Sequence, residues 1–485
     1  MATASRFKGL VGNTNSLPNW NYDSQRSINR YPEFNETGLG KDSEFAQLVP
    51  TPGLTTLLTV DTPGQSRNGY TTSNNALYWT FGNTLYKITG YSGTSVGWTS
   101  TFVGNIPGTG DVQYSDNGLQ LFCVCSTGAT YIADLVSNAF WLAGSQSGDG
   151  DGWLPASSVT YMDGYVVFTK MNSNEFFWTD LYSTQVEALN FASAETNPDH
   201  VVKVLSNNED LWVFGGTTTE LWYDLGSGNT VFERRQGILV ETGAASPMTI
   251  EKLNNTVFWL AVDDRGGPIV YMANGYSPVR VSTFAIENIL QSCTSDQIAQ
   301  ATADSNQWNG HYFYTLNIPG LTSTYVFDMT SYNQSGKASW FEKQSGYGQA
   351  ANRSIAEGHA YYMGKHITGD YLSTGQLYFF DQNSYTENGL AIARIRTTPH
   401  VSNSMKRVKY ISLQIDYQAG TISDQYQPPQ VGVTGVYGSE PLAEAAITAD
   451  MAAIQLEWPN ASIQGQTIVY GANSEFSKTY TTEVS

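Results

Sequence analysis

A repeated hairpin pattern restricts the fold of this 485-residue chain more than any other feature of its sequence. Seven times, at a spacing of roughly 43 to 55 residues, a two-residue turn precedes a strongly apolar strand. Asn-Gly and Asp-Gly favour the type I′ turns of β-hairpins because both residues tolerate positive φ. The turns are Asn74-Asn75, Asn117-Gly118, Asp163-Gly164, Asn207-Asn208, Asn254-Asn255, Asn309-Gly310 and Glu357-Gly358. Units of this length are typical of the blades of a β-propeller.

Most units carry a second apolar strand soon after the first, such as Thr84–Ile88 and Ala129–Leu135. A weaker strand before the turn and another after the pair give about four strands per unit. We therefore predict an all-β chain with a β-propeller of about seven four-stranded blades over residues 54–398. Residues 1–53 are predicted to form an extended N-terminal arm. Residues 399–485 lack the repeat and are predicted to form a C-terminal β-rich tip module.

The longest interval between turns contains a helical pattern. Ile286, Ile289, Leu290 and Cys293 are spaced i, i+3, i+4 and i+7, which places them in one apolar stripe of a helix. Thr294 followed by Gln297 has the spacing of a capping box that opens a second short helix. We predict a short helical insertion over about 283–301, which packs on the propeller rim or on a neighbouring subunit.

The charge balance argues against a surface that binds nucleic acid. The chain has 24 Lys+Arg against 43 Asp+Glu, a formal net charge of −19, and phosphate binding needs a basic face. It has no apolar run long enough to span a membrane and no hydrophobic signal core after Met1, so we expect neither membrane insertion nor Sec-type secretion. Its three cysteines form no CxxC pair and it has only five histidines. We therefore expect no metal site, no disulfide framework and no cofactor.

Motifs of common enzyme classes are missing from the sequence. GxSxG, HExxH, Walker A and dinucleotide-binding patterns do not occur, and we expect a protein that is not an enzyme. Glycosidases with a propeller fold use paired carboxylates. Glu220, Asp224, Glu233 and the Asp263-Asp264-Arg265 turn are the most plausible members of such a pair. Solvated turn or strand-end roles are the favoured interpretation of each.

Aspartates also recur near the end of the second strand in five units, at Asp134, Asp180, Asp224, Asp328 and Asp381. They could line a ligand or calcium site, but we favour strand-end residues that accept backbone N–H bonds in the next turn. The loop Ser147–Gly152 has two aspartates but lacks the length and terminal glutamate of an EF-hand loop. A flexible linker is the favoured interpretation of this loop.

Three segments resemble a known protein family. They are Asn29-Arg30-Tyr31-Pro32-Glu33 leading to Pro52-Gly53-Leu54, the VTYMDGYVVFTK and FFWTDL strands of the third unit, and the helical segment 284–294. The chain thereby resembles the tail nozzle or tail hub proteins of short-tailed bacteriophages, also called packaged-DNA stabilisation proteins. The resemblance covers most of residues 25–400, whereas the C-terminal segment 401–485 matches poorly.

The resemblance implies a structural protein of the virion tail, assembled in the host cytoplasm. It implies a homo-hexameric ring beneath the portal and its adaptor, with attachment sites for a tail needle or tip and for tail spikes or fibres. Duplex DNA would be retained by the tube and would pass through a net-negative lumen without specific binding. Candidate subunit or partner contacts are Arg26, Asn29, Tyr31, Ile286, Ile289, Leu290 and Gln297. The alternative is a tail-associated propeller that binds or cleaves host-surface glycans.

Overall fold

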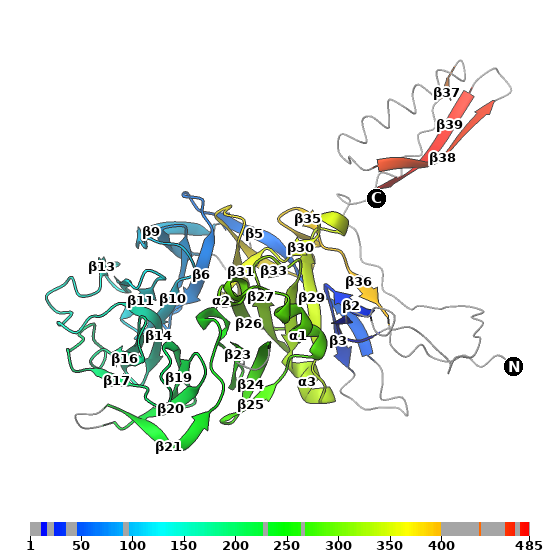
Figure 1. Cartoon of the computed structure of the whole chain (residues 1–485). Coiled ribbons are helices and arrows are strands. Elements are labelled where there is room, and N and C mark those ends of the chain that lie inside the picture. The colour runs from blue at the N-terminus through cyan, green and yellow to red at the C-terminus, as the bar shows by residue number, and fades with distance from the viewer. Residues whose placement is uncertain are drawn as a thin grey trace, which may run out of the picture. The chain divides into compact units, whose positions relative to one another are not determined.

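Four-stranded antiparallel sheets follow one another along the chain in the computed structural model, as the blades of a propeller (Figure 1). The structure describes residues 11–16, 24–34, 46–90, 97–226, 231–262, 267–398, 436–437, 461–470 and 476–484. The chain divides into two compact units, Met1–Val401 and Ser402–Ser485. The first unit contains the propeller. The second contains a three-stranded sheet of β37 (Val436–Tyr437), β38 (Ala461–Tyr470) and β39 (Phe476–Val484), in the order β37-β39-β38.

Each blade is a meander of four strands in chain order, apart from the seventh. The first three are β6 (Ser66–Thr71), β7 (Leu77–Phe81), β8 (Thr84–Thr89) and β9 (Thr99–Asn105); β10 (Gln113–Asp116), β11 (Gln120–Val124), β12 (Thr130–Asp134) and β13 (Phe140–Leu142); and β14 (Ala156–Met162), β15 (Tyr165–Lys170), β16 (Glu175–Trp178) and β17 (Phe191–Ser193). The next three are β18 (Val201–Asn207), β19 (Asp210–Gly215), β20 (Thr219–Asp224) and β21 (Phe232–Val240); β22 (Glu251–Leu253), β23 (Thr256–Val262), β24 (Pro268–Asn274) and β25 (Ser277–Arg280); and β26 (Thr302–Trp308), β27 (His311–Asn317), β28 (Thr324–Asp328) and β29 (Trp340–Ser345).

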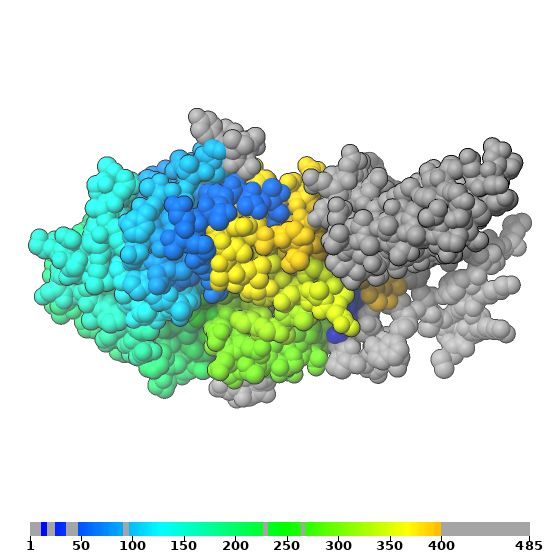
Figure 2. All heavy atoms as spheres, turned by 90° about the horizontal axis from the view of Figure 1, so that it is seen from above, coloured from blue at the N-terminus to red at the C-terminus, as the bar shows by residue number. Residues whose placement is uncertain are grey.

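Blade 7 takes its outer strand from the other end of the propeller sequence. β31 (Ala356–Tyr362), β32 (Lys365–Asp370) and β33 (Gln376–Asp381) are completed by β5 (Gly53–Thr59), which pairs antiparallel with β33. Figure 2 shows the blue atoms of this N-terminal part of the chain beside the yellow atoms of blade 7. A Cβ at Gly53 would lie 2.5 Å from the Ser384 carbonyl oxygen, so glycine is required where β5 enters the blade. The propeller ring is thus closed by hydrogen bonds between two distant segments.

The predicted propeller of seven four-stranded blades and its helical insertion are confirmed, with two turns misplaced. The turn of blade 4 is Asn208-Glu209, one residue later than predicted, because Asn207 ends β18 and pairs with Asp210. The helices are α1 (Phe284–Gln291) and α2 (Ser295–Ala299), between blades 5 and 6. The predicted seventh turn, Glu357-Gly358, is wrong, because both residues lie inside β31 and the hairpin turn is Met363-Gly364. Gly358 has φ +74° at a register shift in β31. A glycine in a β-bulge has the sequence signature of a turn.

Apolar side chains fill the spaces between neighbouring blades. One core cluster joins Phe258 and Leu260 of blade 5 to Tyr314 and Trp340 of blade 6, and comparable clusters lie between blades 1 and 2, 2 and 3, 3 and 4, 4 and 5, and 7 and 1. Hydrogen bonds link neighbouring blades as well: the hydroxyl of Ser246, before blade 5, donates to the carbonyl of Ala301, just before blade 6, at 2.7 Å. The high aromatic content of the sequence is therefore used in packing between blades.

Four of the five strand-end aspartates accept backbone N–H bonds in the following turn, as favoured from the sequence. The carboxylates of Asp134, Asp224, Asp328 and Asp381 accept from Ser137, Gly226, Ser331 and Asn383. Asp328 thereby caps α3 (Met329–Ser335), a helix that the sequence analysis did not predict. Asp180 differs, because its carboxylate accepts from the Asn190 side-chain amide at 3.0 Å.

The interpretation of Ser147–Gly152 as a flexible linker is wrong, because Asp149 is a buried hydrogen-bonding centre. Its side chain is 1% exposed. It accepts from the backbone N–H groups of Gly144 and Gln146, the Trp141 indole and the Thr184 hydroxyl at 2.9–3.2 Å. The loop is held against blade 3 by the Gly152 N–H, which donates to the Val186 carbonyl at 2.9 Å.

The Asp149→Ala variant will be less stable than the wild type by about 2 kcal/mol, because it leaves several buried donors without an acceptor. Urea unfolding monitored by tryptophan fluorescence measures this difference. Asp151→Ala is the matched control, since Asp151 lies in the same loop and is exposed. Equal midpoints for the two variants would show that the Asp149 hydrogen bonds do not stabilise the loop.

Candidate functional site at the edge of blade 6

The N-terminal arm extends the sheet of blade 6 beyond its four strands. β2 (Ser24–Ile28) runs parallel to β29, with Ile28 beside Glu342. β1 (Asn15–Ser16) and β36 (Ile395–Thr397) both pair antiparallel with β2. The edge of β29 also pairs with β30 (Asn352–Arg353). Segments from both ends of the first unit thus meet on one blade.

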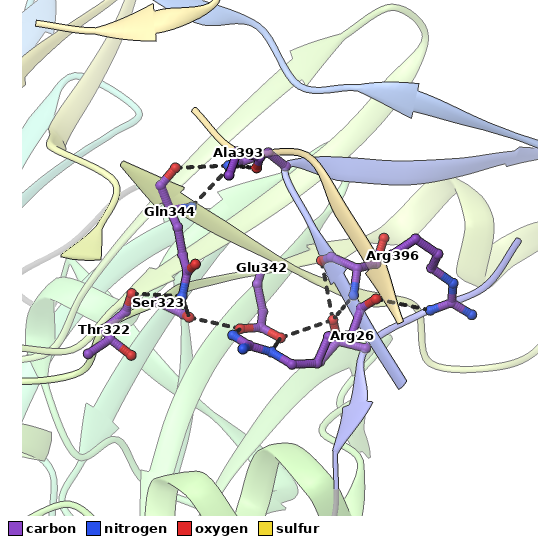
Figure 3. A network of polar contacts seen from close by, with 10 residues as sticks. Arg26, Thr322, Ser323, Glu342, Gln344, Ala393 and Arg396 are labelled. Carbon is purple, nitrogen blue, oxygen red and sulfur yellow. Dashed lines mark hydrogen bonds and ion pairs between the residues drawn. The ribbon is translucent and has the colours of Figure 1, made fainter. Parts of the chain in front are cut away.

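A buried carboxylate holds the arm in place (Figure 3). Glu342 on β29 is 3% exposed and receives the Arg26 guanidinium in bidentate geometry, at 3.0 and 2.5 Å. The hydroxyls of Thr14 and Ser323 donate to the same carboxylate at 3.3 and 2.8 Å. The hydrogen bond to Glu342 raises the pKa of Arg26. Bidentate pairing fixes direction as well as distance, so it sets the register of the arm.

The side chain of Asn29 forms hydrogen bonds to the backbone of neighbouring segments where the arm turns. Its side-chain oxygen accepts from the Gln344 N–H at 3.0 Å, and its amide donates to the carbonyls of Gln344 and Ala393 at 2.9 and 2.7 Å. The residue has φ +53°, a left-handed conformation that asparagine tolerates better than most residues. The chain can therefore turn from β2 into β3 (Arg30–Phe34) without losing hydrogen bonds to β29.

Tyr31 anchors the β3–β4 hairpin to the outer face of blade 6. β3 pairs with β4 (Ala46–Pro50), and the Tyr31 ring is 1% exposed. Its centroid lies 4.9–5.8 Å from the rings of His311, Phe313 and Phe341. Burial raises the pKa of Tyr31 to about 12. The ring is used in packing within the chain.

The helical insertion also packs mainly on its own chain. Ile286 and Leu290 are at most 1% exposed in the core between blades 5 and 6, and Ile289 packs against the same cluster. Thr283 caps α1, and Thr294 with Gln297 forms the predicted capping box of α2. Gln297 is half-buried.

The predicted contact residues therefore fall into two groups. Asn29, Tyr31, Ile286 and Leu290 are buried within the chain, whereas Arg26, Ile289 and Gln297 remain partly exposed. Their role in contacts with other subunits stays a prediction. The structure brings Arg26, Asn29 and Tyr31 together on blade 6 and places the helix residues in the next interblade core.

Sequence reasoning missed the most exposed aromatic ring near the helices. Phe284 is 74% exposed at the start of α1, and the Arg280 guanidinium lies 4.4 Å from its ring centroid. Glu287 holds that guanidinium at 2.5 and 2.9 Å. The signal was present, because Phe284 falls outside the i, i+3, i+4, i+7 stripe of its helix.

Charged side chains of opposite sign occupy the inner strands of the propeller. Lys203 donates to the Ile250 carbonyl at 2.9 Å, and Glu357 pairs with Arg353 at 2.7 Å and accepts from Thr302. Burial raises the pKa of Glu251 to about 6. Thr302 lies on β26 and Glu357 on β31, so their hydrogen bond joins the inner strands of blades 6 and 7.

The carboxylates suggested for glycan cleavage do not form a pair. Glu220 is buried and accepts from the Thr196 N–H and the Trp222 indole at 2.8 and 3.0 Å. Asp224 lies four residues further along β20, about 13 Å away, beyond the separations that glycosidases use. Asp224 pairs with Phe232, so Glu233 lies on the opposite face of the sheet. The Asp263-Asp264-Arg265 turn lies outside the described residues.

Within the described residues, no group of three or more His, Cys, Asp or Glu side chains is arranged to hold a metal ion. A helix long and apolar enough to span a bilayer is likewise missing from that part of the chain.

Comparison with known families decides which proteins share this propeller. The family described as bacteriophage P22 Gp10, β-propeller, matches residues 10–385, which include most of the arm, the seven blades and the helical insertion. The chain belongs to this family. The predicted tail hub resemblance is thereby confirmed. The C-terminal unit lies outside the matched segment.

Three individual proteins are similar to parts of this chain. The tail hub protein gp10 of Salmonella phage P22 is 25% identical over 345 residues, which cover 67% of this Gp10-family chain and 67% of that protein. The WD40 β-propeller domain of Doa1 aligns with 68% of the chain and 97% of its own length, at 12% identity and a TM-score of 0.40. The extracellular domain of BT4673 from B. thetaiotaomicron aligns with 69% of the chain and 40% of its own length, at 8% identity and a TM-score of 0.43.

The Glu342→Gln variant will loosen the arm while the propeller stays folded. Loss of the charge weakens the Arg26 pair and the hydroxyl bonds by about 2 kcal/mol, discounted for the partly exposed Arg26, which corresponds to roughly thirtyfold faster local opening. Hydrogen exchange of β2 amides measures this opening. Glu33→Gln on β3 is the matched control, because Glu33 binds the exposed Gln47 amide. Unchanged protection of β2 in Glu342→Gln would contradict a clamp at this position.

Proposed function

We propose that this protein is a structural component of a phage tail, a nozzle in which six copies form a tube that continues the portal and adaptor channel. Membership of the Gp10 propeller family is the observation that carries the proposal. The relative named a tail hub protein aligns with 67% of this chain. We further propose that the tube retains packaged DNA and conducts it during ejection, with a tail needle or tip and spikes or fibres as distal partners.

Hydrogen bonds between the inner strands of neighbouring blades support a channel that lies between copies and not along the axis of one propeller. Inner strands of neighbouring blades are joined by side-chain bonds, such as Thr302 to Glu357 at 2.7 Å and Ser66 to the Glu357 carbonyl at 3.1 Å. Opening such an axis for a duplex would break these buried contacts. A tube of several copies conducts DNA without any change inside a blade.

The charge of the chain supports conduction without binding. Each copy carries a net charge of −19, so six copies surround a passing duplex with negative charge. Binding that releases condensed counterions needs Lys and Arg at the phosphates. A wall of the same sign as DNA lowers that affinity and allows the duplex to move.

Electron microscopy of the full chain, alone and mixed with the phage portal and adaptor, tests this function. We expect six-fold tubes coaxial with the adaptor. Monomers that do not associate with the portal–adaptor complex would contradict it. In that case glycan arrays and reducing-end assays on the full chain would test the alternative.

A further inference from the structure

The outer strands of the blades differ in their protection against pairing with another chain. An unpaired outer strand exposes N–H and C=O groups, which proteins shield with charges, proline, short strands or covering segments. β13 and β17 have three residues each, and β25 has four and contains Pro278. β21 is longer but carries Glu233, Arg234 and Arg235. Blades 2 to 5 are therefore protected by length or charge.

Blades 6 and 7 are protected by other segments. β2 pairs with β29 at the edge of blade 6. At the edge of blade 7, the Ser384 hydroxyl lies 3.4 Å from the Leu54 carbonyl, and the carbonyls of Ser384 and Thr386 approach Gly53. The start of β5 is therefore covered.

β9 of blade 1 has no charge, no proline and no covering strand among the described residues, and its pairing with β8 is interrupted by a single bulge at Val103. It is seven residues long, TSTFVGN, without charge or proline, and Phe102 at its centre is 59% exposed. It ends the sheet order β6-β7-β8-β9, and none of the described strands pairs with its outer edge. Threonine, phenylalanine and valine also favour strand pairing. β9 therefore has the properties of a strand that accepts a partner strand.

The net charge restricts where two copies can meet. Copies that each carry −19 repel one another, so a contact between them is favoured where both surfaces lack charge. β38, the ten-residue strand ASIQGQTIVY, has no charged residue and lies at the end of its sheet order. Its neighbour β39 contains Lys478 and Glu483. Among the described strands of the C-terminal unit, β38 is thus an uncharged outer strand.

We propose that β9 of one copy pairs with β38 of a neighbouring copy, which adds a strand to blade 1 and joins consecutive subunits. The two strands lie on different units, so the contact is heterologous and forms a ring when its rotation closes. Main-chain hydrogen bonds supply the affinity of such strand addition, and side chains at alternate positions supply its specificity. This inference rests on the proposed ring, and it identifies the strands through which consecutive subunits of that ring contact one another.

Disulfide trapping in the full chain tests this pairing. A Cys293→Ser background leaves the buried Cys123 and Cys125. One population carries Phe102→Cys, and a second, with a size tag, carries Gln466→Cys or Thr467→Cys. Two β38 positions are used because successive residues of a strand point to opposite faces. Paired strands place Cβ atoms at disulfide distance, so the mixture is expected to give a cross-linked heterodimer with one of the two.

The outcomes separate the contact from the proposed function. Homodimers of Phe102→Cys alone, or six-fold tubes without the heterodimer, would overturn the pairing while the nozzle function stands. A cross-link formed within single chains of the double-cysteine variant would also overturn it. Failure to form tubes with the portal and adaptor would contradict the nozzle function itself, and any heterodimer in that sample would still support the pairing.

A charge placed on β9 gives an independent readout. Thr101→Lys introduces an exposed charge at the centre of β9 and is expected to raise the concentration needed for ring formation at least tenfold. Gln236→Lys is the matched control, because it adds the same charge to the exposed and already charged β21. Thermal unfolding checks that both variants are folded. Equal assembly of the two would overturn the pairing.

Discussion

The Leu57→Asp variant will lose about 4 kcal/mol or more of unfolding free energy, because it places an unpaired carboxylate in an apolar core at the closure of the propeller. Leu57 on β5 is 4% exposed and packs in the cluster that contains Trp79 of blade 1 and Leu377 of blade 7. The substitution acts on both blades at once. Urea unfolding followed by tryptophan fluorescence measures the loss.

Thr56→Asp is the matched control, because the Thr56 side chain is next to Leu57 on β5 but is exposed. A chain that starts at residue 60 lacks β5 and is expected to expose apolar surface, which a fluorescent hydrophobic dye detects. A synthetic peptide of residues 51–61 is expected to suppress that dye binding. If Leu57→Asp and Thr56→Asp unfold at the same urea concentration, β5 does not close blade 7.

The Trp340→Ala variant will be destabilised by about 4–5 kcal/mol, since it removes one of the largest fully buried side chains. Trp340 packs in the core between blades 5 and 6 and donates its indole N–H to the Val281 carbonyl at 2.8 Å. Val281 closely precedes the helical insertion. The loss should therefore appear as global unfolding, together with lower hydrogen-exchange protection of α1.

Phenylalanine substitutions separate the hydrogen bond from the packing. Trp259 is as buried as Trp340, but its indole N–H has no hydrogen-bond partner among the described residues. Trp340→Phe leaves the Val281 carbonyl unpaired and should cost about 1–3 kcal/mol more than Trp259→Phe, which removes an unpaired donor. Equal losses in equilibrium unfolding would show that the Trp340 bond contributes nothing beyond packing.

Local sequence signals predicted the blades because each hairpin is specified by neighbouring residues. The spacing of Ile286 and Leu290 and the Thr294–Gln297 pair predicted both helices in the same way. The seventh turn was wrongly placed at Gly358 because glycines with positive φ occur in bulges as well as in turns. The pairing of β5 with β33 could not be predicted, since no local pattern encodes a partner at the far end of the propeller sequence.

At the candidate site, too, the sequence identified residues of the arm but not their partners far along the chain. Arg26, Asn29 and Tyr31 were selected as contact residues, and the structure brings them together on blade 6. Their partners Glu342, Gln344 and Phe341 lie on β29, and nothing in the sequence links that strand to the arm. The arm residues are buried because the arm pairs with β29, and the hydrophobic pattern of the sequence does not reveal this tertiary pairing. The exposed Phe284 could have been found by asking which helix residue the apolar stripe leaves out.

Closure of blade 7 by β5 also sets an order of events during synthesis. β5 leaves the ribosome first, and its partner β33 follows only after all the other blade strands have been made. At bacterial elongation rates this interval is roughly 15 to 60 seconds. During that time blades 1 to 6 can form in sequence, while β5 waits without its partner and the ring stays open. Ribosomes stalled before residue 376 should therefore hold chains that remain protease-sensitive at β5, and completion of translation is what seals the propeller.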